Sequence, residues 1–156
     1  MAIIGIIAEY NPFHTGHEYH IARSRELLGA DSTVICVMSG DFVQRGEAAL
    51  YSKFARAEAA CRCGADLVIE LPLPWALSSA EGFARGAVGL LGALGATHLS
   101  FGSECGDVQR LERIAENLID PAVNAEISRE LNESANNSYA SARQTVLARR
   151  LGDEAK

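Results

Sequence analysis

The chain has 156 residues, which is enough for one compact domain with a sizeable core. Hydrophobic residues make up 48% and charged residues 22%, a composition that is ordinary for a globular protein. The net charge of −6, from 20 acidic and 14 basic residues, excludes a global basic field that would attract nucleic acid. The apolar run at the N-terminus is too short for a signal peptide or a membrane span and has no basic flank. We therefore expect a cytoplasmic protein without a membrane partner.

Four short apolar runs predict the strands of a parallel sheet. They cover residues 2–8, 33–38, 67–69 and 98–101, at intervals that match the length of a strand–helix–strand unit. The first two runs are continuously apolar and rich in Ile and Val, as expected for parallel strands covered on both faces. Helical patterns at residues 17–28, 53–63 and 79–94 fill the gaps. The sequence therefore predicts an α/β fold with an open, Rossmann-like parallel sheet and right-handed crossovers.

Beyond Asp107 the pattern predicts helices only, over residues 108–118, 121–131 and 139–151, with a polar loop at residues 133–138. The helix predicted at residues 79–94 begins directly after Ser78, which stands at capping-box spacing from Glu81. No low-complexity tract or clear boundary divides the chain, so we expect residues 1–156 to form a single domain.

The four cysteines, Cys36, Cys61, Cys63 and Cys105, include no C-x-x-C pair and lack the spacing of a zinc site. We expect them to be buried, reduced thiols. No cluster of carboxylates identifies metal ligands either, so the sequence predicts no metal-ligating residue.

The segment that carries chemistry begins where the first predicted strand ends. Its sequence runs from Ala8 to His20 as AEYNPFHTGHEYH, and an Asn-Pro turn leads from the strand directly into a helix. Thr15 and Glu18 have capping-box spacing, which predicts Thr15 as the N-cap of that helix. Gly16 lets a ligand approach the backbone closely, and the free N–H groups of a helix start favour anions. Because open α/β sheets bind ligands at the carboxyl ends of their strands, a phosphate site is predicted here.

Three histidines, His14, His17 and His20, lie within this segment. A single histidine at a helix start is more often a cap or a core residue than a ligand contact. Two imidazoles beside a glycine at a strand-to-helix turn can instead donate hydrogen bonds to phosphate oxygens, and His14 and His17 carry that interpretation. His20 can face either the ligand or the core. The sequence contains neither a P-loop nor a G-x-G-x-x-G motif after the first strand.

The H-x-G-H pattern at residues 14–17 resembles the signature of the HIGH-type nucleotidyltransferase superfamily. Further segments, in the same order along the chain, resemble the bacterial tRNA(Met) cytidine acetate ligase family. They are EYNPFH at residues 9–14, MSGDFVQRGE at residues 38–47, ADLVIELP at residues 65–72, FGSE at residues 101–104 and Ser138-Tyr139.

The resemblance implies an ATP-dependent ligase that makes N4-acetylcytidine at the wobble position of elongator tRNA(Met), using free acetate and an acetyl-adenylate intermediate. It implies that His14 and His17 are catalytic, and we expect magnesium to accompany the ATP. The ATP-binding residues that it implies are Ile7, Ala8, Glu9, Tyr10, Asn11, Pro12, Phe13, His14, Thr15, Gly16, His17, Glu18, Tyr19, His20 and Gly102.

Polar residues around the loop after the second strand are further candidates. Gln44, Arg45, Lys53 and Arg56 can meet phosphate, acetate or RNA, and the alternative is a solvated loop and helix face. Glu70 ends a strand near the site or caps a neighbouring backbone, whereas Trp75 is expected to pack.

The chain departs from the family pattern at Asp41, where Asn is expected. Family members are several hundred residues long, so the resemblance implies that the basic tRNA-binding part lies beyond Lys156. Two alternatives to the ligase remain open. One is a small-molecule adenylyltransferase of coenzyme biosynthesis, and the other is a non-catalytic relative that binds a nucleotide or a partner.

Overall fold

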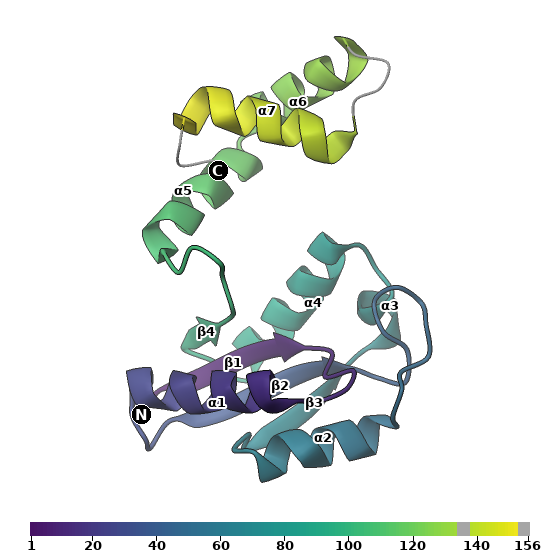
Figure 1. Ribbon diagram of the computed structural model, residues 1–156, viewed down its shortest axis with the longest axis vertical. Coiled ribbons are helices and arrows are strands. Elements are labelled where there is room, and N and C mark those ends of the chain that lie inside the picture. Colours follow the sequence, from purple (N-terminus) through teal and green to yellow (C-terminus); the bar gives the residue numbers. More distant parts are fainter. Residues whose placement is uncertain (134–137, 153–156) are drawn as a thin grey trace. The chain divides into compact units, whose positions relative to one another are not determined.

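A computed structural model describes residues 1–133 and 138–152 (Figure 1). Four parallel strands form one sheet in the order β3-β2-β1-β4. Their bounds are β1 Ile3–Ala8, β2 Thr33–Ser39, β3 Leu67–Leu71 and β4 His98–Ser100. The register pairs Ile4 with Val34 on one side and with His98 on the other. The predicted α/β fold and its four strands are therefore confirmed, with ends that differ by one or two residues.

Helices cover both faces of the sheet, as Figure 1 shows. Helices α1 (Thr15–Leu28) and α2 (Lys53–Arg62) pack on one face, and α4 (Ala80–Ala93) packs on the other. Side chains alternate along a strand, so those of β1 enter two cores. Ile4 and Ile6 belong to the core under α1 and α2, whereas Ile3 and Ile7 belong to the core under α4. A further helix, α3 (Leu73–Ala76), was not predicted because its four residues are too few to show a helical period.

Gly5 sets how closely α4 approaches the sheet. A Cβ at Gly5 would lie 2.7 Å from Leu91 Cδ1, which is closer than non-bonded carbon atoms come. The missing side chain therefore lets α4 lie directly against β1.

The C-terminal residues form three helices, α5 (Val108–Ile119), α6 (Pro121–Glu133) and α7 (Tyr139–Leu151), close to their predicted bounds. A core between α6 and α7 contains Val123, Ile127, Ala142 and Val146. The chain forms two compact units, Met1–Gly102 and Ser103–Lys156, and the single domain stays a prediction. Most of the loop predicted at residues 133–138 lies outside the described residues. Within the described ranges, no helix is long and apolar enough to cross a membrane.

Two local predictions were wrong. The N-cap of α4 is Ser79, whose hydroxyl accepts the Gly82 N–H, while the Ser78 hydroxyl donates to the Trp75 carbonyl. The cysteines are all free thiols, yet only Cys36 is buried; Cys61 and Cys105 are exposed and Cys63 is half-buried. Cys61 lies in the last turn of α2 and Cys63 directly follows this helix, which covers one face of the sheet from outside.

Candidate nucleotide-binding site

The site begins with Tyr10, which follows β1 and adopts a left-handed backbone conformation with φ of 48°. Its side chain is only 2% exposed, and the hydroxyl donates to Cys36 Sγ at 3.2 Å. Burial raises the pKa of Tyr10 above its usual value and raises the pKa of Cys36 to about 11. Both groups therefore stay protonated at neutral pH, and they anchor the loop in the core.

The start of α1 is capped by His14, so the prediction that Thr15 is the N-cap was wrong. His14 Nδ1 accepts the Gly16 N–H at 3.0 Å, and His17 Nδ1 accepts the His14 N–H at 3.2 Å. The two rings thus form a reciprocal capping box, with imidazoles in the place of the usual hydroxyl and carboxylate. Thr15 is the first residue inside the helix.

This cap fixes which ring nitrogens remain available. A neutral imidazole carries one N–H, and a nitrogen that accepts a hydrogen bond cannot also carry the proton. Because both Nδ1 atoms accept backbone N–H groups, the protons of His14 and His17 lie on Nε2. Burial, followed by the proximity of His14 and His20, lowers the pKa of His17, which keeps this ring neutral at pH 7. Each ring can therefore donate one Nε2–H bond to a ligand.

The two imidazoles lie together and are supported by aromatic rings. The His14 and His17 rings stack with centroids 3.8 Å apart at an interplanar angle of 30°. Tyr10 meets the His17 ring edge-on at 4.9 Å, and Phe13 lies 5.5 Å from it. These contacts fix the orientation of His17 beside the exposed ring of His14.

The third histidine, His20, contacts a different element. Its Nε2 lies 2.8 Å from Ser100 Oγ of β4, and Ser100 Oγ lies 2.7 Å from Ser24 Oγ. Burial lowers the pKa of His20. The ring therefore links α1 to the edge of the sheet, one turn away from the other two histidines.

Polar side chains of the loop between β1 and α1 hold the loop that follows β2. Glu9 Oε1 accepts the Gln44 N–H at 2.6 Å, and Asn11 Oδ1 accepts the Leu50 N–H at 2.7 Å. The second loop forms a short hairpin, with an isolated antiparallel bridge between Phe42 and Ala48. The Glu9 and Asn11 side chains thus hold the backbone of the loop that follows β2.

Sequence reasoning missed the burial of Arg56, which is 2% exposed although it belongs to a surface helix. Its guanidinium donates to the Tyr51 carbonyl at 3.1 Å, to the Glu9 carbonyl at 2.5 Å and to the Gly40 carbonyl. The side chain therefore joins the ends of β1 and β2 to the start of α2. A single sequence carries no signal for this role, because an arginine on an amphipathic helix is usually solvated.

Lys53 is paired rather than free. Its Nζ lies 2.7 Å from Glu70 Oε2 and 3.8 Å from Asp41 Oδ2, and the hydrogen bond to Glu70 raises the pKa of the lysine. The negative charge of Asp41, which departs from the family pattern, is thus offset by Lys53. Gly40 leaves room for this pair, since a Cβ there would meet Glu70 Oε1.

The remaining candidates are exposed or pack elsewhere. Arg45 is exposed on the hairpin after β2, and Gly102 is exposed with no atom within 4 Å of an added Cβ. Trp75 packs on Gly86 of α4, as expected, with ring atoms 2.5 Å from the position of a Cβ there. Among residues 1–133 and 138–152, no group of three His, Cys, Asp or Glu side chains is arranged to hold a metal ion.

The parallel sheet, together with an H-x-G-H loop that opens α1, defines a protein of the nucleotidyltransferase class. The profile of one sequence family, described as HIGH Nucleotidyl Transferase, matches residues 1–155. The chain belongs to this family.

Curated relatives are similar over most of the chain. It is 48% identical over 150 residues to the tRNA(Met) cytidine acetate ligase of Acetivibrio thermocellus, covering 94% of this chain and 35% of the relative. It is 56% identical over 116 residues to the enzyme of the same name from Syntrophotalea carbinolica, covering 74% and 27%. The chain thus spans about a third of the length of the curated relatives it matches.

A solved structure of Thermotoga maritima TmcAL bound with alpha-thio ATP is also similar. It superimposes with a TM-score of 0.86 at 44% identity, covering 96% of this chain and 36% of that one. A second structure, of the apo form, matches equally well.

Proposed function

We propose that this chain forms the ATP-dependent, adenylate-forming part of a tRNA(Met) cytidine acetate ligase. One observation carries the proposal: His14 and His17 are held by their Nδ1 atoms, so that both can donate Nε2–H at the N-terminus of α1. The relatives named tRNA(Met) cytidine acetate ligase support the reaction, and the alpha-thio ATP in the similar structure supports ATP as the nucleotide.

In the proposed first step, an acetate oxygen attacks the α-phosphorus of ATP. The bond from that phosphorus to the bridging oxygen breaks, diphosphate leaves, and acetyl-adenylate remains. Negative charge builds up on the phosphoryl oxygens and the departing diphosphate. The Nε2–H groups of His14 and His17 and the N–H groups of the first turn of α1 stabilise that charge, and one such donor is worth about 10²–10³ in rate.

In the second step, the N4 amine of cytidine attacks the acetyl carbon and AMP leaves. The proton lost by the amine passes to the leaving phosphate or to water. The acceptor is elongator tRNA(Met), which we expect to be held mainly by parts of the relatives beyond the stretch that this chain matches.

ATP is expected to lie along residues 7–20 and to reach Gly102 with its adenosine. Tyr10, Phe13, Glu9 and Asn11 act in this segment by holding its shape, while the histidines and the helix start meet phosphate. Magnesium arrives as part of the ATP complex, where phosphates and water supply most of its ligands.

The four candidates around the second loop differ in what supports them. Arg45 is exposed and suits RNA or phosphate, whereas Lys53 and Arg56 are engaged with carboxylates and carbonyls and position the loop. Gln44 contributes its backbone N–H to Glu9, and its side chain stays a candidate contact.

Exchange of labelled diphosphate into ATP tests the proposal. We expect exchange that depends on acetate and needs no RNA, since adenylate formation is reversible. Exchange that depends instead on a phosphorylated coenzyme precursor would favour a small-molecule adenylyltransferase. ATP binding without any exchange would favour a non-catalytic relative. Either of these two results would overturn the proposal.

A further inference from the structure

A pocket of about 380 Å³ lies between α2 and the loop that precedes α1. Its lining residues are Pro12, Phe13, Tyr51, Ala55, Arg56 and Ala59. The lining combines apolar side chains with the aromatic rings of Phe13 and Tyr51, and its polar groups include the Tyr51 hydroxyl and the buried guanidinium of Arg56. Small-molecule pockets commonly occupy about 300–1,000 Å³ with such a lining, so this one suits a ligand near the size of a nucleoside.

The pocket shares a wall with the proposed catalytic loop. Phe13 lines it, and the same ring lies 5.5 Å from the His17 ring and 5.0 Å from the Tyr10 ring. A ligand that stacks on Phe13 would thus lie next to the histidines. Pro12 and Phe13 belong to the segment along which ATP is expected to lie, whereas the other four lining residues lie outside that segment.

The strand order separates the pocket from the expected position of adenosine. Gly102 follows β4, on one side of β1, whereas α2 leads into β3, on the opposite side of β1 beyond β2. A nucleotide that extends from the start of α1 toward Gly102 leaves the α2 side of the loop vacant. That side stays open to the RNA acceptor of the proposed reaction.

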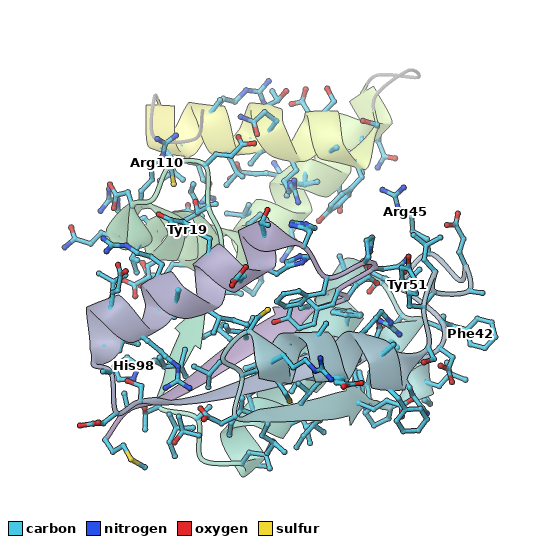
Figure 2. All side chains as sticks on the ribbon, turned by 60° about the horizontal axis from the view of Figure 1, so that its bottom comes forward. Tyr19, Phe42, Arg45, Tyr51, His98 and Arg110 are labelled. Carbon is cyan, nitrogen blue, oxygen red and sulfur yellow. The ribbon has the colours of Figure 1, made fainter. Side chains whose placement is uncertain are left out.

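Exposed aromatic side chains occur in the segment that contains Tyr51 of the pocket. Tyr51 is 60% exposed and Phe54 is 76% exposed, and both follow the hairpin that carries Phe42 and Arg45. Figure 2 shows Phe42, Arg45 and Tyr51 on the same side of the molecule. No hydrogen bond or ion pair joins the Arg45 side chain to another described residue, so this cation is available to a phosphate. Exposed apolar patches often mark binding sites.

We infer that this pocket takes the acceptor base: one unpaired pyrimidine from an RNA loop, stacked against Tyr51 and Phe13, with Arg45 meeting the adjoining phosphate. Aromatic rings that stack on splayed bases and arginines that meet the backbone are the usual means of binding single-stranded RNA. The inference rests on the proposed function, because it names where the RNA acceptor of that reaction binds.

Photocrosslinking tests the position of the base. The probe is a short RNA hairpin with a single 4-thiouridine at the centre of its loop, irradiated with the chain and mapped by mass spectrometry. We expect the crosslink at Tyr51 or Phe13, and competition by the same hairpin with cytidine at that place. A crosslink at other residues only, or none at saturating RNA, would overturn the inference.

Substitution tests the stacking. With the cytidine hairpin, Tyr51→Ala should weaken binding by about fivefold or more, and with an abasic residue in place of cytidine it should change little. Leu27→Ala, at an exposed apolar side chain of α1, serves as the control and should leave binding unchanged. Equal losses for the cytidine and abasic hairpins would show that Tyr51 does not contact the base.

Acetate-dependent exchange, measured on each variant without RNA, separates the two proposals. If the chain catalyses exchange but Tyr51→Ala weakens binding of the cytidine and abasic hairpins equally, the pocket assignment alone would be overturned. Absence of exchange in the unaltered chain would overturn the proposed function, whatever the RNA result.

Discussion

At the scale of single residues, the proposed site depends on the different contacts that the two ring nitrogens of each imidazole make. Nδ1 of His14 and of His17 accepts a backbone N–H at the helix start, and Nε2 of each is the atom that we propose for contact with ATP. The lowered pKa of His17 keeps one ring of this stacked pair, with centroids 3.8 Å apart, neutral at pH 7. In this proposal, folding and catalysis use different atoms of the same side chains.

We predict that His17→Ala lowers turnover by about 10²–10³ and weakens ATP binding much less, because the lost donor acts mainly on charge that develops in the transition state. Initial rates and equilibrium binding of ATP would measure the two effects. Equal losses in turnover and ATP affinity would show that His17 only binds the ground state.

Two further substitutions separate the roles of the nitrogens. An asparagine oxygen can replace Nδ1, so His17→Asn should keep the bond from the His14 N–H, and with it the helix start, while losing turnover. A glutamine amide can replace Nε2–H, so His17→Gln should retain more turnover than His17→Asn. The reverse order of activities would contradict the assignment of the protons.

The lowered pKa values of His17 and His20 predict how stability depends on pH. Between those lowered values and the ordinary value near 6.5, the unfolded chain binds more protons than the folded one. The free energy of unfolding should therefore be highest above about pH 6.5 and fall as the pH falls through this range. Urea titrations at several pH values would show it, and His20→Gln should reduce the slope.

The sequence predicted the family and the fold around this segment better than its local geometry. The anion site at the end of the first strand stays a prediction from residue types and spacing. The cap at His14 was missed because Thr is the stronger cap by propensity, and the Tyr10–Phe13–His17 contacts that favour His14 are tertiary. The hydrogen bond from Tyr10 to Cys36 joins residues far apart in sequence and left no local pattern.

At the scale of elements, Arg56 is the side chain that holds the carboxyl ends of the first two strands together. We predict that Arg56→Met destabilises the fold by about 2–4 kcal/mol, because the buried carbonyls of Glu9 and Gly40 lose their donors. Arg62→Met on the same helix is the control, since Arg62 only pairs with Glu58 at the surface and should matter by less than about 1 kcal/mol. Chemical denaturation would measure both, and similar losses would contradict this role for Arg56.

The elements themselves were predictable where a periodic signal was long enough. Continuous apolar runs marked β1 and β2, and α7 has the predicted bounds. The short α3 and the one-residue shift of the α4 cap to Ser79 were not predictable, because single turns and neighbouring serines offer alternatives that only packing decides.

At the scale of the whole molecule, the chain passes from one compact unit to the other between Gly102 and Ser103. Residues 101–107 are exposed and contain neither helix nor strand, whereas the exposed loop after β2 is fastened by Glu9 and Asn11. We predict that limited proteolysis cuts first within residues 101–107. Mass spectrometry of the early fragments would show it. Earlier cutting within residues 41–50 would mean that the two side-chain anchors do not restrain that loop.

The thermal stability of the protein does not require a histidine at position 14. Asn, Asp and Ser all begin helices more readily than His, and each would satisfy the Gly16 N–H that His14 now satisfies. A library sorted only for expression or heat resistance would therefore accumulate such replacements, which lack the imidazole Nε2–H that we propose as a donor to phosphate. Any effort to engineer this scaffold has to select for turnover from the first round.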